Sequence, residues 1–290
     1  MNRREFLFAA GSLAAAAPTR IIDTHTHFYD PSRPEGVPWP GRNDPLLFRT
    51  VLPKHYKEIA RPLGVSGTVV VEASPWVEDN QWVLDLARED PFLVGLVGHL
   101  EPGQPEFKTN LERFRKNPLF LGIRVGPAAL SKDASDFERL SDADLEIDVL
   151  GPASMFPSLV RFAGRFAKLR IVINHLPLDW PADSVAPRAA LRELRNCPNV
   201  FAKVSGVLRR MDGRTPADVA FYRESLDELW TIFGPGRVIY GSNWPVCEKV
   251  APYADVQKVV MEYFAAKGTD AVERYFWKNS LTAYRWKPAG

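Results

Sequence analysis

The sequence predicts a single (β/α)8 barrel, and three observations lead to this prediction. Eight short apolar or β-branched runs follow one another, and helix-like stretches separate most of them. Strands that alternate with helices form parallel β/α units. Eight such units match a barrel whose usual size is about 250 residues. A doubly wound open sheet is the alternative, but no glycine-rich phosphate loop follows the first run.

The predicted strands are apolar runs in which polar residues come late. They are 21–28, 67–74, 92–100, 120–126, 145–152, 170–177, 200–207 and 237–244. The predicted helices have helical periodicity or helix-forming composition. They are 54–63, 77–89, 105–116, 156–167, 186–195 and 216–233. The segment 127–144 is polar and less clearly helical, so this crossover has the weakest signal of its own.

The first 17 residues are predicted to be a signal peptide, and residues 18–290 are predicted to form the barrel. A short basic start, an apolar stretch and four alanines at 14–17 follow in the order of a secretory signal. The start Arg-Arg-Glu-Phe-Leu at 3–7 resembles a twin-arginine signal, so we expect export to the bacterial periplasm. The alternative is a frayed terminal helix of a cytosolic enzyme.

Composition indicates a soluble globular protein without a nucleic-acid partner. Charged residues make up 25% of the chain, and the net charge of +2 is too small for nucleic-acid binding. No segment after the signal reaches the ~20 apolar residues of a spanning helix, so no membrane association is expected once the signal is removed. Cys197 and Cys247 have no zinc or redox spacing, and their pairing stays open, as does the oligomeric state.

Polar residues inside the apolar runs gather toward the end of each run. In barrels of this kind the catalytic groups lie at the carboxyl ends of the strands. We therefore expect a site at the barrel mouth. The residues concerned are His25, His27, Glu72, His99, Arg124, Asp148, His175, Lys203 and Asn243.

Histidines are the first candidates for chemistry at this mouth. His25 and His27 are two apart on one strand, so their side chains leave the same face. Two imidazoles on one face can bind zinc or a similar ion, or they can polarise a substrate carbonyl. His175 ends the sixth strand and is a further candidate. The alternative for His25 and His27 is a structural role in tying the first strand to its loop, and the alternative for His175 is a satisfied polar group of the core.

Charged residues in the strands are candidates for binding substrate. Arg124 lies among apolar residues and needs an anionic or carbonyl partner. A substrate carboxylate or lactone oxygen would serve, and so would Glu72 or Asp148. Asp148 shares its parity with Glu146, and Lys203 ends an apolar triplet. Asp148 and Lys203 are predicted to orient substrate, with a structural ion pair as the alternative.

Four tryptophans lie in predicted loops after strands. Trp244 follows the eighth strand and is predicted to contact substrate, and Trp39, Trp76 and Trp180 are further candidates for a pocket wall. The alternative is packing on the barrel rim.

Several of these motifs together resemble the amidohydrolase-2 family. They are Asp-Thr-His-Thr-His at 23–27, Gly-Ile-Arg-Val at 122–125, Asn-His-Leu at 174–176 and Gly-Ser-Asn-Trp-Pro-Val-Cys at 241–247. The resemblance runs from about residue 21 to 284 and is strongest to the branch of sugar lactonases and 2-pyrone-4,6-dicarboxylate lactonase. It implies a barrel that opens a small ester or sugar lactone. It also leaves open a metal-dependent decarboxylase or a non-catalytic binding barrel.

The resemblance also implies roles for single residues. His25 and His27 match the pair that binds metal or polarises the carbonyl, His175 matches a third histidine, and Arg124 matches an arginine that holds substrate. One divalent ion such as zinc, held by the three histidines, and a metal-independent site both fit this pattern.

Asn243 stands where the family has an aspartate that activates water. An amide accepts no proton and brings no negative charge to a metal site. Three outcomes remain: His175 or Asp148 acts as the base, carbonyl polarisation and positioning suffice, or the barrel binds without turnover.

Overall fold

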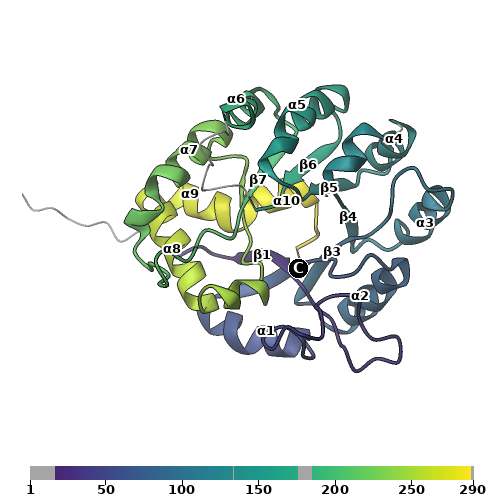
Figure 1. Cartoon of the computed structure of the whole chain (residues 1–290), viewed down its shortest axis with the longest axis horizontal. Helices are drawn as coiled ribbons and strands as arrows, with labels where there is room; N and C mark the ends of the chain where they lie inside the picture. The colour runs from purple at the N-terminus through teal and green to yellow at the C-terminus, as the bar shows by residue number, and fades with distance from the viewer. Residues whose placement is uncertain (1–16, 133, 176–184, 289–290) are drawn as a thin grey trace, which may run out of the picture.

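Eight parallel strands in the order β1 to β8 form the centre of the computed structural model, which describes residues 17–132, 134–175 and 185–288. The helices surround the strands (Figure 1). The strands are β1 (Ile21–Thr26), β2 (Val65–Val71), β3 (Leu93–Gly98), β4 (Phe120–Val125), β5 (Glu146–Val149), β6 (Arg170–Ile173), β7 (Val200–Val204) and β8 (Val238–Tyr240). This order and orientation confirm the predicted (β/α)8 barrel.

The helices follow the strands in turn and close the chain after β8. They are α1 (Pro53–Ala60), α2 (Val77–Glu89), α3 (Phe107–Phe114), α4 (Ala134–Asp142), α5 (Phe156–Arg165), α6 (Val185–Glu193), α7 (Arg223–Phe233), α8 (Tyr253–Ala266), α9 (Thr269–Glu273) and α10 (Asn279–Tyr284). No helix in the described parts of the chain is both long and apolar enough to cross a membrane.

The apolar core has two layers because strand side chains alternate between the two faces of the sheet. Ile22, Val69 and Val71 belong to the cluster inside the barrel. Ile21 and Val70, their neighbours in sequence, pack in the larger cluster between the strands and the helices. The inner layer fills the barrel below the strand ends, so the mouth above it is the place where polar groups can meet.

Strands β1 and β8 close the barrel at their carboxyl ends. Thr26 and Trp244 form a parallel bridge, and the amide of His27 donates to the carbonyl of Trp244 at 2.9 Å. The amide of Asn243 donates to the carbonyl of His25 at 2.9 Å. This closing seam therefore holds the first-strand histidines beside the turn that carries Asn243.

Helix α4 occupies the segment whose helical signal was weakest. Its Phe137 and Leu140 are buried and three residues apart, and the Phe137 ring packs against Phe162 of α5 at 4.8 Å between centroids. Only two residues anchor an otherwise polar helix, which explains its weak periodicity. Helices α8 and α9 were not among the predicted helices.

Some predictions meet the limits of the described chain. The predicted signal peptide lies almost entirely outside the described residues, and so does Trp180.

Strand β6 ends at Ile173 and β8 at Tyr240, so both are shorter than predicted at their carboxyl ends. Cys197 and Cys247 are both free thiols.

Candidate functional site

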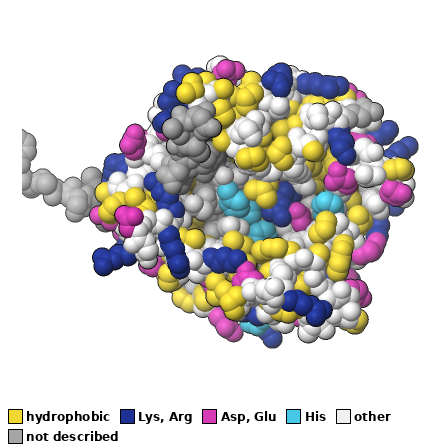
Figure 2. Space-filling view, in the orientation of Figure 1, with side chains coloured by type: hydrophobic (Ala, Val, Ile, Leu, Met, Phe, Trp, Pro, Cys, Tyr) yellow, Lys and Arg dark blue, Asp and Glu magenta, His cyan; other side chains and the backbone are white. Residues whose placement is uncertain are grey.

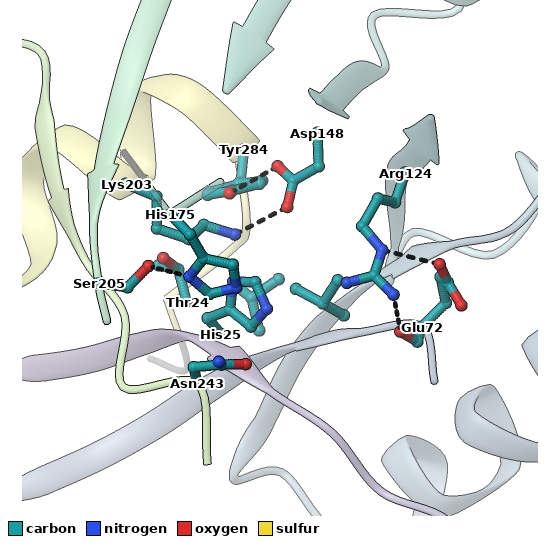
Figure 3. Close-up of polar contacts among 12 residues, drawn as sticks. Thr24, His25, Glu72, Arg124, Asp148, His175, Lys203, Ser205, Asn243 and Tyr284 are labelled. Atoms are coloured by element: carbon teal, nitrogen blue, oxygen red, sulfur yellow. Dashed lines mark hydrogen bonds and ion pairs between the residues drawn. The ribbon is translucent and has the colours of Figure 1, made fainter. Parts of the chain in front are cut away.

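Three histidines and Asn243 meet at the barrel mouth from distant parts of the chain. The ring centroids of His25 and His27 lie 4.9 Å apart, and those of His25 and His175 lie 4.4 Å apart. The Asn243 Oδ1 atom lies 3.2 Å from His27 Nε2. Histidine side chains occupy the middle of this face (Figure 2), and His25, His175 and Asn243 lie next to one another in Figure 3. The structure brings together all four residues predicted to be catalytic.

Two of these residues have an unusual backbone. His175 and Asn243 follow β6 and β8 with φ angles of 51° and 64°, in the left-handed region. Residues other than glycine rarely adopt this conformation, and at a strand end it is a common feature of functional turns. Because of this conformation, neither side chain follows the alternation between the two faces of the sheet that the preceding strand has.

Asp23 ties β1 to the turn that follows β8. Its Oδ1 accepts hydrogen bonds from the amides of His25 and Ser242 at 3.0 and 2.9 Å, and its Oδ2 accepts from the Tyr56 hydroxyl at 2.6 Å. Gly241 lies so close to the histidine that an added Cβ would be 2.9 Å from the His25 Cβ. The small size of Gly241 and the buried carboxylate of Asp23 thus position His25.

The hydrogen bonds of His27 decide its tautomer. Its Nδ1 lies 2.9 Å from the Val71 carbonyl, which only accepts, so Nδ1 carries the hydrogen. The neutral ring then has a lone pair on Nε2, which faces Asn243. The amide can turn its Nδ2–H toward this lone pair, or Nε2 and Oδ1 would both be available to hold a cation.

Electrostatics keep the imidazoles neutral near pH 7. Burial, with the charge of Arg124 in support, lowers the pKa of His27 to about 3. Burial, with the charge of Lys203 in support, lowers the pKa of His175 to about 3. The pKa of His25 is lowered well below its usual value, chiefly by burial and then by Lys203. Neutral imidazoles can accept a hydrogen bond or bind a metal ion.

Donor atoms for one divalent ion are present at the closing seam. Both ring nitrogens of His25 are buried and have no hydrogen-bond partner among the described atoms, and buried polar atoms normally have one. His25, His27 and the Asn243 oxygen offer ligand types that suit Zn²⁺. Among the described residues, however, no three His, Cys, Asp or Glu side chains converge to hold an ion. The trio of histidine ligands therefore stays a prediction.

Arg124 has an internal partner. Its Nε donates to Glu72 Oε1 at 2.7 Å and its Nη2 to the Glu72 carbonyl at 2.8 Å (Figure 3). Of the partners considered from sequence, the internal acid is therefore the one in contact. The pair borders a pocket that His99 also lines.

Lys203 and Asp148 bind each other beneath the histidines. Lys203 Nζ donates to Asp148 Oδ2 at 2.7 Å, and the Tyr284 hydroxyl donates to Asp148 Oδ1 at 2.9 Å (Figure 3). Both side chains of the ion pair are 0% exposed. The structural ion pair that sequence analysis gave as the alternative is therefore present, and a role of these side chains in orienting substrate stays a prediction.

Trp244 was predicted to contact substrate, and the structure contradicts this prediction. Its side chain is 1% exposed and packs between Phe28 and Tyr56, with centroid distances of 6.2 and 5.1 Å. Its indole nitrogen donates to Glu248 Oε1 at 2.7 Å. The ring therefore packs in the aromatic core behind the mouth.

Trp39 and Trp76 lie in different environments. Trp39 contacts the site directly, with its ring 5.7 Å from that of His27. Trp76 is 39% exposed on the loop before α2.

Sequence reasoning missed two supporting residues. The hydroxyl of Ser205 lies 2.8 Å from His175 Nδ1, and Tyr284 reaches the buried ion pair from α10. Ser205 lies two residues after Lys203, and this spacing was the one available signal. Tyr284 had no signal for this contact, because α10 reaches it only through the fold.

Comparisons with known proteins found a family, relatives and solved structures that this chain resembles. A model of the amidohydrolase family matches residues 22–286. L-fucono-1,5-lactonase of Burkholderia ambifaria is 29% identical over 93% of this chain and 97% of its own. A crystal structure of an amidohydrolase from Burkholderia multivorans with bound zinc has a TM-score of 0.76 at 24% identity, covering 92% of this chain and 99% of that one. The structure of a candidate 2-pyrone-4,6-dicarboxylic acid hydrolase from Pseudomonas putida has a TM-score of 0.71 at 20% identity, covering 93% of this chain and 98% of that one.

Proposed function

Because the chain belongs to the amidohydrolase family, whose model spans nearly all of the barrel, we propose that it hydrolyses a small sugar lactone. The observation that carries this proposal is the meeting of three neutral histidines with Asn243 at the closing seam. The lactonase name of the Burkholderia ambifaria relative supports the substrate class. A 2,6-dihydroxybenzoate decarboxylase structure is similar too, but more distantly, with a TM-score of 0.59 at 11% identity, so the decarboxylase alternative has weaker support.

The reaction consumes one water and leaves a hydroxy acid. Water attacks the lactone carbonyl while the bond from that carbon to the ring oxygen breaks, and one proton moves from the water to the ring oxygen. Asn243 orients the water through hydrogen bonds. His175 accepts the proton and passes it to the ring oxygen. A low pKa makes His175 a weak base, but it makes the imidazolium a ready proton donor.

His27 and Arg124 act on the substrate from two sides of the mouth. The Val71 carbonyl holds the His27 ring in one tautomer, which fixes the direction of Nε2 toward the reacting centre. Glu72 holds Arg124 through Nε and Nη2, so the guanidinium is already ordered before substrate binds. Its remaining amino group can therefore donate to the substrate without a further loss of side-chain entropy. A preorganised donor stabilises the oxyanion more than a mobile one does.

A bound divalent ion would add carbonyl polarisation and a more acidic water. His25, His27 and the Asn243 oxygen would hold it. This donor set has no carboxylate, so we expect affinity below that of a site with the aspartate.

A lactone panel with metal analysis tests the proposed function. Purified protein is assayed by acid release with sugar lactones, as isolated and after dialysis against a chelator, alongside elemental analysis. We expect hydrolysis of at least one sugar lactone well above the spontaneous rate. No hydrolysis in either state, or release of CO₂ from a panel of carboxylic acids, would contradict the proposal.

We also propose that residues 1–17 direct export by the twin-arginine route. The order of charge, apolar stretch and small residues supports it. Fractionation of bacterial cells, with terminal sequencing of the periplasmic product, tests this. Replacing Arg3 and Arg4 by lysine should leave the protein unprocessed in the cytoplasm. A processed periplasmic product from that variant would contradict the route.

A further inference from the structure

A pocket of about 290 Å³ lies at the barrel mouth, at the carboxyl ends of four neighbouring strands. Its polar and apolar walls include Glu72 after β2, His99 after β3, Arg124 in β4 and Leu150 after β5. A water molecule takes up ~30 Å³ in the liquid, so the pocket has room for a short chain of a substrate. The proposed chemistry uses Arg124 but leaves His99 without a role.

Two consecutive carbonyls at the end of β2 connect this pocket to the reacting centre. The Val71 carbonyl lies 2.9 Å from His27 Nδ1, and the next carbonyl, that of Glu72, accepts from Arg124 Nη2 at 2.8 Å. The side chains of Arg124 and Glu72 are 16% and 15% exposed, so both are open to a ligand. Figure 2 shows basic, acidic and histidine side chains next to one another at the middle of this face. A substrate that contacts both His27 and Arg124 therefore reaches the wall of the pocket.

The backbone of His99 is fixed by a buried side chain. Asn80 of α2 donates from Nδ2 to the His99 carbonyl at 2.8 Å, and its Oδ1 accepts from the His99 amide at 2.8 Å. Asn80 is 2% exposed, and Gly98 leaves room for it, since an added Cβ would lie 2.3 Å from Asn80 Oδ1. His99 is thus held in place before a ligand binds, which lowers the entropy cost of binding.

The His99 imidazole is available to a ligand. Within the parts of the chain that the structure describes, its ring makes no hydrogen bond. The charged side chains of the pocket differ in this respect, because Arg124 binds Glu72 at 2.7 Å and Glu101 binds Lys132 at 3.2 Å. An imidazole can donate or accept a hydrogen bond, so His99 can pair with a ligand hydroxyl.

The charges of the pocket favour a neutral ligand. The guanidinium of Arg124 is already matched by Glu72, and Glu101 adds a second carboxylate to the wall. A substrate carboxylate would approach both acids, and the repulsion of like charges opposes its binding. A hydroxyl group has no charge, and it can donate to a carboxylate or accept from the guanidinium.

We propose that His99 is a substrate-binding residue and that this pocket holds a neutral, hydroxyl-bearing chain attached to the lactone ring. This inference rests on the proposed lactone hydrolysis and names the class of sugar lactone that the same site prefers. A lactone whose chain ends in a carboxylate is then a poor substrate.

Three lactones that differ only at C6 test the preference. D-Glucono-1,4-lactone has a hydroxyl group there, 6-deoxy-D-glucono-1,4-lactone has none, and D-glucaro-1,4-lactone has a carboxylate. We expect the KM of the 6-deoxy lactone to be about fivefold above that of the gluconolactone, as for one neutral hydrogen bond. The KM of the carboxylate should be roughly tenfold above it or more. Equal KM values for the first two, or a lower KM for the carboxylate, would overturn the inference.

Replacing His99 tests its contact with the hydroxyl group. His99→Ala should raise the KM of the gluconolactone about fivefold and leave the KM of the 6-deoxy lactone and both kcat values nearly unchanged. His99→Gln retains a hydrogen-bonding group and should keep part of the preference. A merely structural role would raise both KM values equally, and that result would overturn the contact.

His55→Ala is the matched control. It also removes an imidazole, but from α1, where His55 Nδ1 accepts from the Leu52 amide at 3.1 Å. Neither KM should change in this variant. A loss of the preference for the hydroxyl group in His55→Ala as large as in His99→Ala would overturn the assignment to His99.

Binding without turnover separates this inference from the proposed function. 1,4-Anhydro-D-glucitol has the ring and the chain of the gluconolactone but no carbonyl. The ring C–H signals of His99 in the proton NMR spectrum are identified by their absence from His99→Ala. A saturable shift of these signals with the anhydroglucitol supports the pocket even if no lactone is hydrolysed, and then only the lactonase proposal fails. Signals that do not shift would overturn the role of His99.

Discussion

The two sides of the barrel mouth differ in whether the hydrogen bonds of their polar groups are satisfied within the protein. The histidine side is defined as His25, His27, His175 and Asn243. There both ring nitrogens of His25 lack a partner among the described atoms, and His27 Nε2 faces the side-chain amide of Asn243. On the ion-pair side, charged groups bind one another through short hydrogen bonds. Its members are Glu72, Arg124, Asp148 and Lys203.

This difference separates reacting groups from supporting ones, except that Arg124 also directs its remaining amino group toward the substrate. A group whose hydrogen bonds are complete within the protein stabilises the fold, whereas a group with an unused lone pair or donor is ready for a ligand. The paired cations also act at a distance, because their charges help to hold the histidines neutral. Four variants or conditions test this division, and they follow in order of expected effect.

His27→Ala should produce the largest change. It removes the imidazole that faces Asn243, so we expect kcat/KM for the lactone to fall about 1,000-fold, or about 4 kcal/mol in the barrier. Circular dichroism and the unfolding midpoint should stay close to native values. Activity near the native level would show that the histidine side does not carry the chemistry.

Lys203→Met should act on stability more than on chemistry. It leaves the Asp148 carboxylate buried without its cation, which we expect to cost about 3 kcal/mol in the free energy of unfolding, measured in urea. Lys203→Met combined with Asp148→Leu should recover most of the loss. A variant with native stability and no activity would instead place Lys203 among the substrate-binding residues.

Acid should weaken the fold through the histidine side. The pKa of His27 is about 3 in the folded protein against an ordinary 6.5, so the unfolded chain binds more protons between these values. Stability therefore falls as the pH drops below 6.5, and this residue has no effect above it. Between pH 7.5 and pH 5 the native protein should lose about 2 kcal/mol more than His27→Asn does. Parallel urea curves for both proteins would contradict the neutral assignment.

Asn243→Asp should have the smallest effect, and it sharpens the role of the amide. A carboxylate beside His27 Nε2 accepts a proton from water and adds charge for a divalent ion. We expect about a tenfold gain in kcat and tighter Zn²⁺ binding, the latter measured by competition with a chelating dye. A fall in kcat would mean that the amide is adapted to a chemistry other than water activation.

Much of the fold was predictable because it depends on local patterns. The alternation of apolar strands with helices predicted the eight β/α units, and the strand-end position of His25 and His27 predicted the site. Helix α4 had a weak signal because only Phe137 and Leu140 anchor it. Helices α8 and α9 were missed although a (β/α)8 barrel has a helix after its eighth strand, because the helices predicted from sequence all lie between predicted strands.

The residues of the candidate site were predictable from the sequence, but the contacts that they make with one another were not. The sequence shows that Arg124 and Lys203 need partners but not which acids supply them, because the partners lie on other strands. It likewise showed Trp244 in a loop without revealing that the loop buries the ring between Phe28 and Tyr56.

The residue types alone determined the barrel, the mouth and the loss of a carboxylate at position 243, because each of these follows from a periodicity or from the chemistry of one side chain. Tertiary structure alone decided which polar groups stay unpaired. A hydrogen bond between strands depends on register and on closure of the barrel, and both arise only when all eight strands are in place.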